Sequence, residues 1–399
     1  MGLISNFRLN YQKSWKENKK AKEYMLSYWE NKSFLNYDLI VVGAGFVGLS
    51  TAIHFKKKRP KARVLILERG TFPSGASTKN AGFACFGSLT EILDDMWSMI
   101  QDEVVKLVEK RAKGLELIQK EFGRKALDFK QSGGFELITE DQLEALDQLS
   151  LINKLLKPIF KKPVFSNLKN YRSFGFDESV KAVVKNQFEG ELDPGKYISA
   201  LWSRANELGI KILTGSHVQK VEKDLGLISV KTGTDELIEF QGSKVAVCTN
   251  AFAGQFFPEF DLEPGRGLVM VSRPFEQKIP WKGSFHFDKG YVYFRKIDGR
   301  LLLGGGRNKD FEGEKSLENT INPTIESYLE NLAETIIFPG QKITWEHKWT
   351  GIMAFGQKKL PIMEKVGDRT AVGVRLGGMG VAMGWEVGRQ LSDLLRKGF

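Results

Sequence analysis

The sequence predicts an α/β fold, in which a parallel sheet flanked by helices is interrupted by an inserted α+β unit built on an antiparallel sheet. Two apolar segments, 37–42 and 63–68, enclose a glycine-rich turn and a helical segment, as in a buried β-α-β unit. Later segments alternate apolar and polar residues, and Asp298-Gly299 joins two of them as a hairpin. The 399 residues also exceed the roughly 250 to 300 that one hydrophobic core usually serves.

The first elements can be placed in chain order. A basic amphipathic helix is expected over residues 11–30. We expect four of its residues to pack on the body of the protein: Tyr24, Met25, Tyr28 and Trp29. After the strand at 37–42, a helix should span 49–58 and end before Pro60.

The remaining elements follow from the same hydrophobic periodicity. Helices are predicted near residues 91–122, 141–156, 194–208, 323–335 and 381–397. Strands are predicted near residues 133–138, 211–213, 217–222, 227–231, 237–241, 244–248, 269–273, 290–296, 300–306, 342–349 and 371–374.

Composition excludes several classes of protein. Apolar residues make up 42% of the chain and charged residues 27%, which rules out a disordered or fibrous protein. Cys85 and Cys248 are too few for a disulfide framework or a four-thiolate metal site, so a reducing compartment is expected. No apolar run approaches the ~18 residues of a membrane span, and we expect a cytoplasmic protein.

The net charge of +11 has several possible meanings. Lysines gather at 13–22, 56–61 and 154–162, and such a balance could attract nucleic acid, an acidic membrane surface or an anionic substrate. No run carries aromatic residues at a spacing suited to base stacking. We therefore expect solvated faces and no stable nucleic-acid partner.

A glycine-rich turn follows the first strand. Gly43-Ala44-Gly45-Phe46-Val47-Gly48 is a G-x-G-x-x-G, and Glu68 ends the next strand 20 residues after Gly48. In such a turn the first glycine permits the tight bend, the second admits a pyrophosphate and the third lets helix and strand pack closely. The helix N-terminus attracts the phosphates, and Glu68 can accept hydrogen bonds from a ribose. These features predict a Rossmann-like dinucleotide site.

Two further segments favour FAD over NAD, because an extended flavin needs contacts beyond the first β-α-β unit. Residues 74–82 offer small hydroxyl and amide groups for a ribityl chain and a flavin edge. Gly377-Gly378-Met379-Gly380 opens the last helix, where backbone N–H groups can face the flavin N1/C2=O edge.

With these motifs, the sequence resembles the D-amino-acid-oxidase-like family of FAD-dependent oxidoreductases, which includes glycine, sarcosine and γ-glutamylputrescine oxidases. The matching motifs run in family order over nearly the whole chain: YDLIVVGAGFVGLSTAIH, SGASTKNAG, ELDPGKY, VAVCTNAFA, DGRLLLGGG, WTGIMAFGQKKLPIM and RLGGMGVAMG. The resemblance implies a discontinuous FAD-binding domain of residues 1–88, 190–255 and 345–399. It implies a substrate domain of residues 89–189 and 256–344, whose antiparallel sheet covers the flavin.

The resemblance also implies a reaction and a set of contacts. Members oxidise the C–N bond of an amine or amino acid by hydride transfer to flavin N5, and water hydrolyses the imine; oxygen is the expected acceptor. Together with the motifs, it assigns cofactor contacts to Gly43, Gly45, Phe46, Val47, Gly48, Glu68, Arg69, Ala76, Ser77, Thr78, Asn80, Ala81, Gly82, Val218, Thr249, Asn250, Ala251, Gly377, Gly378, Met379, Gly380 and Val381.

The chain departs from the family pattern in four places. Residues 352–355 lack the arginine that often binds a substrate carboxylate after the Trp-Thr-Gly turn. Val381-Ala382 replace a carboxylate-binding lysine of sarcosine-type members, and Leu301-Leu302-Leu303 replace the strand that carries an oxygen-activating lysine. A flavin dehydrogenase with another acceptor is therefore an alternative. No cysteine for covalent attachment stands near the Trp turn, so FAD should be bound non-covalently.

Other side chains must then anchor the substrate. Period-two alternation puts Tyr291, Tyr293 and Arg295 on one face of a strand, and a family tyrosine that touches substrate falls at or near Tyr291. Arg307 follows three glycines, and Arg375 precedes the last glycine-rich turn. Each of the three arginines can bind a carboxylate with two hydrogen bonds, or be a structural ion-pair residue.

The four histidines show no metal-ligand spacing, so no metal is expected. We expect structural roles for His54 and His347. His217 directly precedes Val218, one of the expected cofactor contacts, and His286 could reach the substrate pocket. A tRNA-modifying flavoprotein is a further alternative, given the positive charge, although the chain leaves no room for a partner methyltransferase domain.

Overall fold

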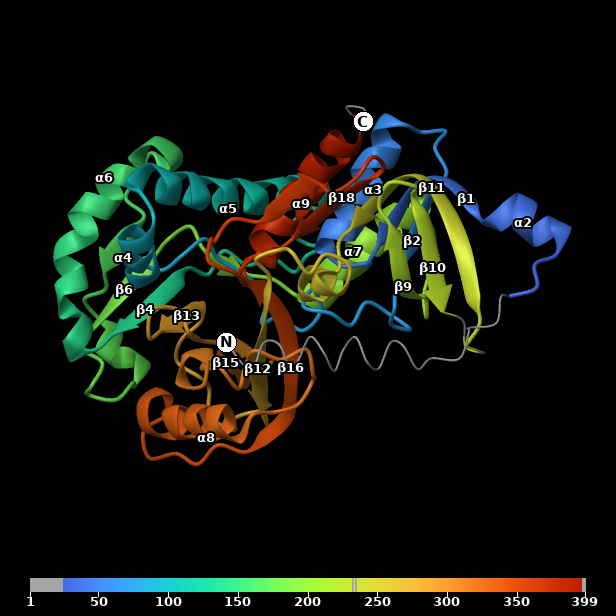
Figure 1. Ribbon diagram of the computed structural model, residues 1–399. Coiled ribbons are helices and arrows are strands. Elements are labelled where there is room, and N and C mark those ends of the chain that lie inside the picture. Colours follow the sequence, from blue (N-terminus) through green and yellow to red (C-terminus); the bar gives the residue numbers. More distant parts are fainter. Residues whose placement is uncertain (1–23, 232, 234, 397–399) are drawn as a thin grey trace, which may run out of the picture.

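A computed structural model describes residues 24–396 of the chain except 232 and 234. Two eight-stranded sheets dominate it, and they lie at opposite sides of the molecule (Figure 1). The first contains the predicted β-α-β unit, and the second is largely antiparallel. The α/β fold with an inserted antiparallel sheet is therefore confirmed.

The first sheet is built around parallel strands. Its order is β17 (Ile362–Lys365), β18 (Thr370–Val374), β11 (Leu237–Val247), β1 (Asn36–Val42), β2 (Val64–Leu67) and β8 (Lys211–Leu213). The strands β9 (His217–Glu222) and β10 (Leu227–Lys231) extend β11 as an antiparallel flap. Strands β18, β11, β1, β2 and β8 run parallel, so their carboxyl ends share one edge of the sheet.

Strand β1 shows why this sheet is apolar on both faces. Leu39 and Val41 pack into the core under the helices, whereas Ile40 and Val42 pack into the core shared with β9 and β10. The helices on the first face are α3 (Phe46–Lys58), α7 (Pro194–Glu207) and α9 (Gly380–Arg396), and α5 (Gln101–Phe122) packs on α9. Alternation along one strand thus serves two cores.

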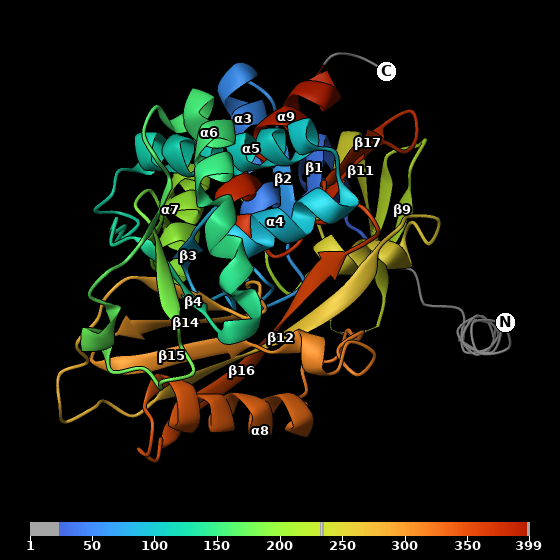
Figure 2. The ribbon, with the colours of Figure 1, turned by 90° about the vertical axis from the view of Figure 1, so that its left-hand side faces the viewer.

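The second sheet has the order β16 (Trp345–Phe355), β12 (Glu263–Ser272), β15 (Arg300–Gly305), β14 (Val292–Ile297), β13 (Ser284–Phe287), β4 (Gly134–Ile138), β6 (Ala182–Asn186) and β5 (Phe165–Asn167). All of its pairs are antiparallel except β13 with β4. Helix α8 (Pro323–Leu332) covers its outer face (Figure 2), where Phe285, Phe294 and Leu329 are fully buried.

Shorter elements complete the described chain. They are α2 (Tyr28–Phe34), β3 (Phe83–Ala84), α4 (Leu89–Ser98), α6 (Leu149–Phe160) and β7 (Gly190–Glu191). Strands β3 and β7 pair with each other between the two large sheets.

Several element predictions need correction. The predicted N-terminal helix lies mostly outside the described residues, and the part described, α2, starts at Tyr28 behind a Ser27 capping box. Of the four side chains expected to pack on the body, Tyr24 is half-buried, whereas Met25, Tyr28 and Trp29 are 93, 69 and 68% exposed. The two strands predicted at 237–241 and 244–248 are one strand, β11. Its first half pairs with β10 and its second half with β1, so the chain continues through Gly242 without a turn.

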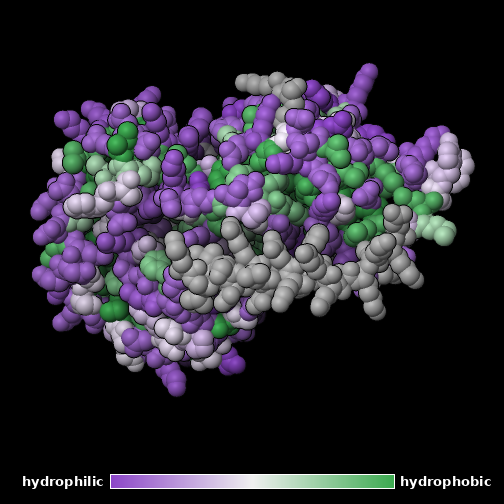
Figure 3. All heavy atoms as spheres, in the orientation of Figure 1, coloured by the Kyte–Doolittle hydropathy of each residue, from purple (hydrophilic) through white to green (hydrophobic). Residues whose placement is uncertain are grey.

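The surface is polar. On the face shown in Figure 3 hydrophilic side chains predominate, and hydrophobic ones form small patches. The lysines at 57, 58, 61, 154, 157, 161 and 162 are exposed, as expected of solvated faces, whereas the run at 13–22 lies outside the described residues. Within the described ranges, no helix is both long and apolar enough to cross a membrane.

Candidate cofactor and substrate site

The glycine-rich turn has the geometry that its sequence requires. Gly43 has φ +100°, a conformation that favours glycine, and its N–H donates to the Leu67 carbonyl at 2.8 Å. A Cβ on Gly48 would lie 1.9 Å from the Gly43 carbonyl oxygen, so only glycine lets α3 approach the turn this closely. The turn therefore delivers the N-terminus of α3 to the carboxyl edge of the first sheet.

Two side chains fix this turn from outside. The carboxylate of Glu68, at the end of β2, accepts hydrogen bonds from the N–H groups of Ala44 and Gly70, both at 2.9 Å. Ser77 Oγ accepts the N–H of Phe46 at 3.0 Å. Because the N-cap residue Gly45 has no side chain, Ser77 supplies the cap from a distant loop.

A single cavity of about 450 Å³ connects the predicted motifs. It runs from the glycine-rich turn, past the loop at 74–82, to the start of α9 and the inner face of the second sheet. Of the predicted site residues, the following line it: Gly43, Gly45, Phe46, Val47, Glu68, Arg69, Ala76, Ser77, Asn80, Ala81, Val218, Thr249, Asn250, Tyr291, Tyr293, Arg307, Arg375, Gly377, Gly378, Met379, Gly380 and Val381.

Four predicted cofactor residues do not line the cavity. Gly48 packs against the backbone of Gly43. Ala251 packs on Ile352 and Ala354 of β16. Thr78 donates its hydroxyl to the Pro73 carbonyl at 2.9 Å, and Gly82 accepts the N–H of Leu192. These residues shape the loops that line the cavity and do not face it.

The segment after β11 presents unused polar atoms. Thr249 Oγ1 and Asn250 Oδ1 are buried and have no hydrogen-bond partner within the part of the chain that the structure describes. Asn250 is held at φ +51° and both residues line the cavity. Because a buried polar atom without a partner is costly, these two atoms indicate a polar ligand at this place.

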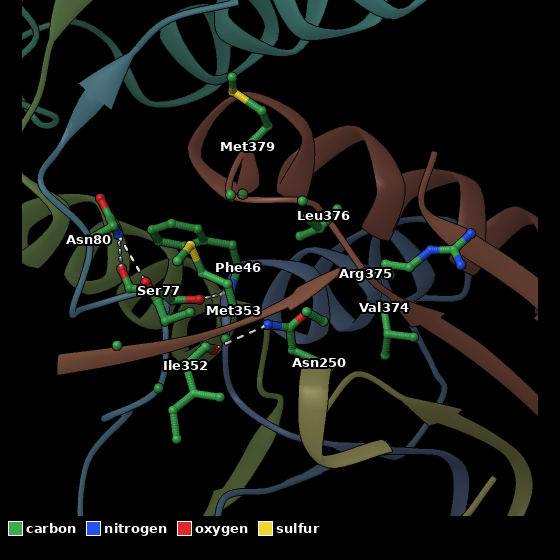
Figure 4. A pocket seen from close by; sticks show the side chains of 18 of the residues that line it. Phe46, Ser77, Asn80, Asn250, Ile352, Met353, Val374, Arg375, Leu376 and Met379 are labelled. Carbon is green, nitrogen blue, oxygen red and sulfur yellow. Dashed lines mark hydrogen bonds between the residues drawn. The ribbon is translucent and has the colours of Figure 1, made fainter. Parts of the chain in front are cut away.

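The last glycine-rich turn approaches the cavity from the opposite side. Gly377 and Gly378 have φ values of +55° and +81°, and α9 begins directly afterwards at Gly380. Met353 on β16 lies between this turn and β12, because its side chain approaches both Gly378 and Gly267. Figure 4 shows Met379 on this turn, above Met353 and Phe46 in that view.

The three candidate arginines have different surroundings. Arg375 donates to the Asp261 carboxylate at 2.8 Å and to the Leu360 carbonyl at 3.1 Å. Figure 4 shows its guanidinium directed away from Phe46 and Met353.

Arg295 does not reach the cavity. It is buried, donates to the Leu192 carbonyl at 3.2 Å and lies 3.7 Å from the Glu191 carboxylate. Strand β14 starts at Val292, so Tyr291 precedes it. Arg295 shares the strand face of Tyr293, but it packs against the β7 segment and does not line the cavity. Both Arg295 and Arg375 thus serve structural ion pairs.

Arg307 differs from both. Its guanidinium stacks 3.9 Å from the Phe355 ring centroid and 4.8 Å from that of Phe311, and it lines the cavity near Tyr291 and Tyr293. Across the described residues it forms no ion pair with a carboxylate. Burial lowers the pKa of Arg307 and raises the pKa of Tyr293 to about 12, so Tyr293 is a neutral phenol at neutral pH. Two aromatic rings thus hold a guanidinium whose edge is available to an anion.

Sequence reasoning missed part of the cavity wall. Three residues that the sequence did not indicate line the cavity: Cys85, Glu91 and Arg111. His286, expected to be able to reach the pocket, lines it as well. Arg111 is buried and donates to the Phe86 carbonyl at 3.0 Å and to Glu91 at 3.2 Å. The sequence contained one signal, because Arg111 interrupts the apolar stripe of α5 formed by Val104, Leu107, Val108, Leu115 and Ile118.

Comparisons with known proteins agree with this geometry. The chain is 21% identical over 374 residues to the probable oxidoreductase OrdL of Haemophilus influenzae, an alignment that covers 90% of this chain and 82% of that protein. Among solved structures, glycine oxidase from Geobacillus kaustophilus matches with a TM-score of 0.72 at 18% identity, over 92% of this chain and 96% of that one. L-proline dehydrogenase from P. horikoshii matches with a TM-score of 0.71 at 18% identity, over 91% and 94%.

The family model described as FAD dependent oxidoreductase matches residues 38–394, which is almost the whole of the described chain. The match includes the glycine-rich turn, the second sheet and the start of α9. The family predicted from the sequence is confirmed: the chain belongs to the DAO family of FAD-dependent oxidoreductases.

Proposed function

We propose that the chain binds FAD non-covalently in the cavity and oxidises the C–N bond of an amino acid or amine. In this proposal the pyrophosphate lies at the N-terminus of α3 and the isoalloxazine ring lies at the Gly377-Gly378 turn. The observation that carries the proposal is the continuity of the cavity, which joins both glycine-rich turns to Arg307 on the second sheet.

The residues present fit such a cofactor. Gly43 and Gly45 line the cavity without side chains that would block the N-terminus of α3, where phosphate oxygens are favoured. Thr249 Oγ1 and Asn250 Oδ1 would gain partners, and Glu68 retains acceptor capacity for ribose hydroxyls. Denaturing the purified protein should release all of its flavin into the soluble fraction, which would establish non-covalent binding.

When bound, FAD would accept the electrons removed as the C–N bond is oxidised to an imine, and water then hydrolyses the imine. The protein orients the substrate and limits the access of water. Arg307 binds a carboxylate, while Phe83, Tyr293 and Met353 form an apolar wall on the same cavity. Positioning of this kind lowers the barrier because the reacting groups are held in place before the reaction.

Arg307→Met tests the role of the carboxylate anchor. We expect the KM for an amino acid to rise about 10- to 100-fold, because the substitution removes charged hydrogen bonds worth roughly 1.5–3 kcal/mol. The KM for the corresponding amine without a carboxylate should not change. Anaerobic reduction of the flavin by matched pairs, such as phenylalanine and phenethylamine, measures both.

A matched control is Arg300→Met, since Arg300 starts β15, the strand that precedes Arg307, but pairs with Glu346 outside the cavity. An unchanged KM for amino acids in Arg307→Met would exclude the anchor. A flavin that no member of a broad amine and amino-acid panel reduces would contradict the proposed reaction itself.

The electron acceptor is a separate part of the proposal. We propose oxygen, with a dehydrogenase as the alternative favoured by the apolar strand Leu301-Leu302-Leu303, in which all three side chains are buried. Such a strand offers no cation to stabilise reduced oxygen. Rates of flavin reoxidation by air and by an artificial dye distinguish the two, because a dehydrogenase reoxidises far faster with the dye.

A further inference from the structure

Three potential metal ligands meet in the wall of the cavity. One ligand atom each from Cys85, Glu189 and His286 lies within 4.8 Å of the others, and all three residues are buried. Any two of the three residues are at least 97 positions apart (286 minus 189), so the cluster has no spacing signature in the sequence. Cys85 and His286 line the cavity, whereas Glu189 lies behind them.

Strand pairing explains the arrangement. Strands β3 and β7 pair with Phe83 opposite Glu191 and Ala84 opposite Gly190, so the next residues along, Cys85 and Glu189, also face each other. His286 lies on β13, which Ser284 ties to β7 through a 2.9 Å hydrogen bond to the Gly190 carbonyl. Three backbone segments therefore fix the three side chains.

Glu189 is oriented as a ligand would be. Its Oε1 accepts the N–H groups of Phe86 and Gly87 at 2.9 and 3.2 Å, which fixes the carboxylate plane. Its Oε2 points toward His286 Nε2 at 3.6 Å, a separation longer than a hydrogen bond. Both atoms are buried and have no partner among the residues described. Two unpartnered buried atoms directed at each other leave a gap suited to an ion.

The charge around the gap favours a cation. Glu136, bonded to Ser88 and Thr90, faces His286 from β4, and Glu91 faces Cys85 from α4. Arg111 lies in the same cavity wall, where it pairs with Glu91. Glu189 adds a buried carboxylate beside Cys85. A divalent cation would offset these charges and stabilise the thiolate.

We infer that Cys85, Glu189 and His286 form a binding site for Zn²⁺, with the fourth coordination position open to the cavity. Cysteine, histidine and carboxylate donors are the set that zinc takes in proteins, and three protein ligands with one open position are typical of its non-structural sites. A thiolate, a carboxylate and a neutral imidazole make the zinc centre neutral. Binding to the protonated thiol releases one proton, and no redox step is involved.

The site goes beyond the proposed function and does not depend on it. The open position would hold water, or an oxygen or nitrogen atom of a substrate. The Phe86 and Gly87 N–H groups that bind Glu189 Oε1 would act as the outer shell that orients the ligand.

The experiment is a zinc titration of the untagged, FAD-loaded protein in competition with a chromophoric chelator. We expect one Zn²⁺ per chain and, by calorimetry in buffers of different ionisation enthalpy, about one proton released per ion. Cys85→Ser should weaken binding at least 100-fold and abolish the proton release. Glu189→Gln, which retains the shape and the Oε1 acceptor, should weaken binding at least 10-fold.

The chain supplies a matched control, since Cys248 is its other cysteine and is also buried. Cys248→Ser should bind zinc as the unaltered protein does. Cadmium provides an independent readout, because a cadmium–thiolate charge-transfer band should appear in the unaltered protein and in Cys248→Ser but not in Cys85→Ser. If the unaltered protein binds no stoichiometric zinc, the proposed site is wrong and Glu189 and His286 are only a buried pair. An equal loss of zinc affinity in Cys85→Ser and Cys248→Ser would also overturn the site.

Discussion

Gly114 on α5 controls how closely α5 approaches the start of α9. A Cβ at this position would lie 1.8 Å from the carbonyl oxygen of Ala382, and ordinary contact begins near 3.4 Å. Gly114→Ala must therefore separate the two helix backbones by about 1.6 Å. The obstacle is a backbone carbonyl in a helix, which cannot rotate away as a side chain could.

The magnitude follows from two opposing effects. Alanine in place of glycine inside a helix stabilises by about 1 kcal/mol. Overpacking a buried contact costs about 1–3 kcal/mol, and we expect the upper end here. The net loss should be about 2 kcal/mol. Because Gly380 and Val381 of the same α9 turn line the cavity, the displacement should also weaken FAD binding about tenfold, roughly one or two hydrogen bonds.

Thermal unfolding and FAD titration of the apoprotein measure both effects. Gly254→Ala is the matched control, because a Cβ there would meet only Leu262 at 4.0 Å, in the 3-10 helix Asn250–Gln255. That variant should unfold at the same temperature as the unaltered protein or higher. If Gly114→Ala is as stable as the unaltered protein and binds FAD equally well, the close α5–α9 contact does not position the cavity.

Two further predictions concern the helix α3. Ser77→Ala removes the acceptor of the Phe46 N–H. Because the lost helix cap is worth about 1 kcal/mol, we expect FAD to bind about fivefold more weakly. Fluorescence titration with FAD measures the affinity, and an affinity equal to that of the unaltered protein would refute this prediction. Burial lowers the pKa of His54 to about 4, below its unfolded value of 6.5. The unfolded state therefore takes up the proton first, and His54 should cost the protein about 2 kcal/mol of stability between pH 6.5 and pH 5. Urea unfolding of the unaltered protein and of His54→Asn at pH 7.5 and 5 tests this, and equal losses in the two would contradict it.

Local sequence was sufficient where the signal is itself local. The turn at Gly43–Gly48 could be predicted because the positive φ of Gly43 favours glycine and the close contact at Gly48 leaves no room for a Cβ. Helix α7 could be placed within one residue because Asp193 caps it and Pro194 starts it. The start of α3 was predicted three residues late, since Phe46, Val47 and Gly48 belong to both the turn and the helix.

Side-chain partners could not be predicted in the same way. Tyr293 and Arg295 share one face of β14 by periodicity, yet Tyr293 lines the cavity and Arg295 is buried against Glu191 and Leu192. Arg307 became the strongest anion-binding candidate only because Phe311 and Phe355 hold its guanidinium, and Phe355 comes from β16, far along the chain.

The sequence by itself determined the family, the two kinds of sheet and the glycine-rich loops that line the cavity, because those depend on periodicity and on glycine at fixed positions. Only the tertiary structure decided which charged side chains are neutralised and which face the cavity, and it alone brought Cys85, Glu189 and His286 together. The physical reason is that a charge or a ligand set depends on atoms within a few ångströms. Strand pairing supplies those atoms from segments far apart in the chain.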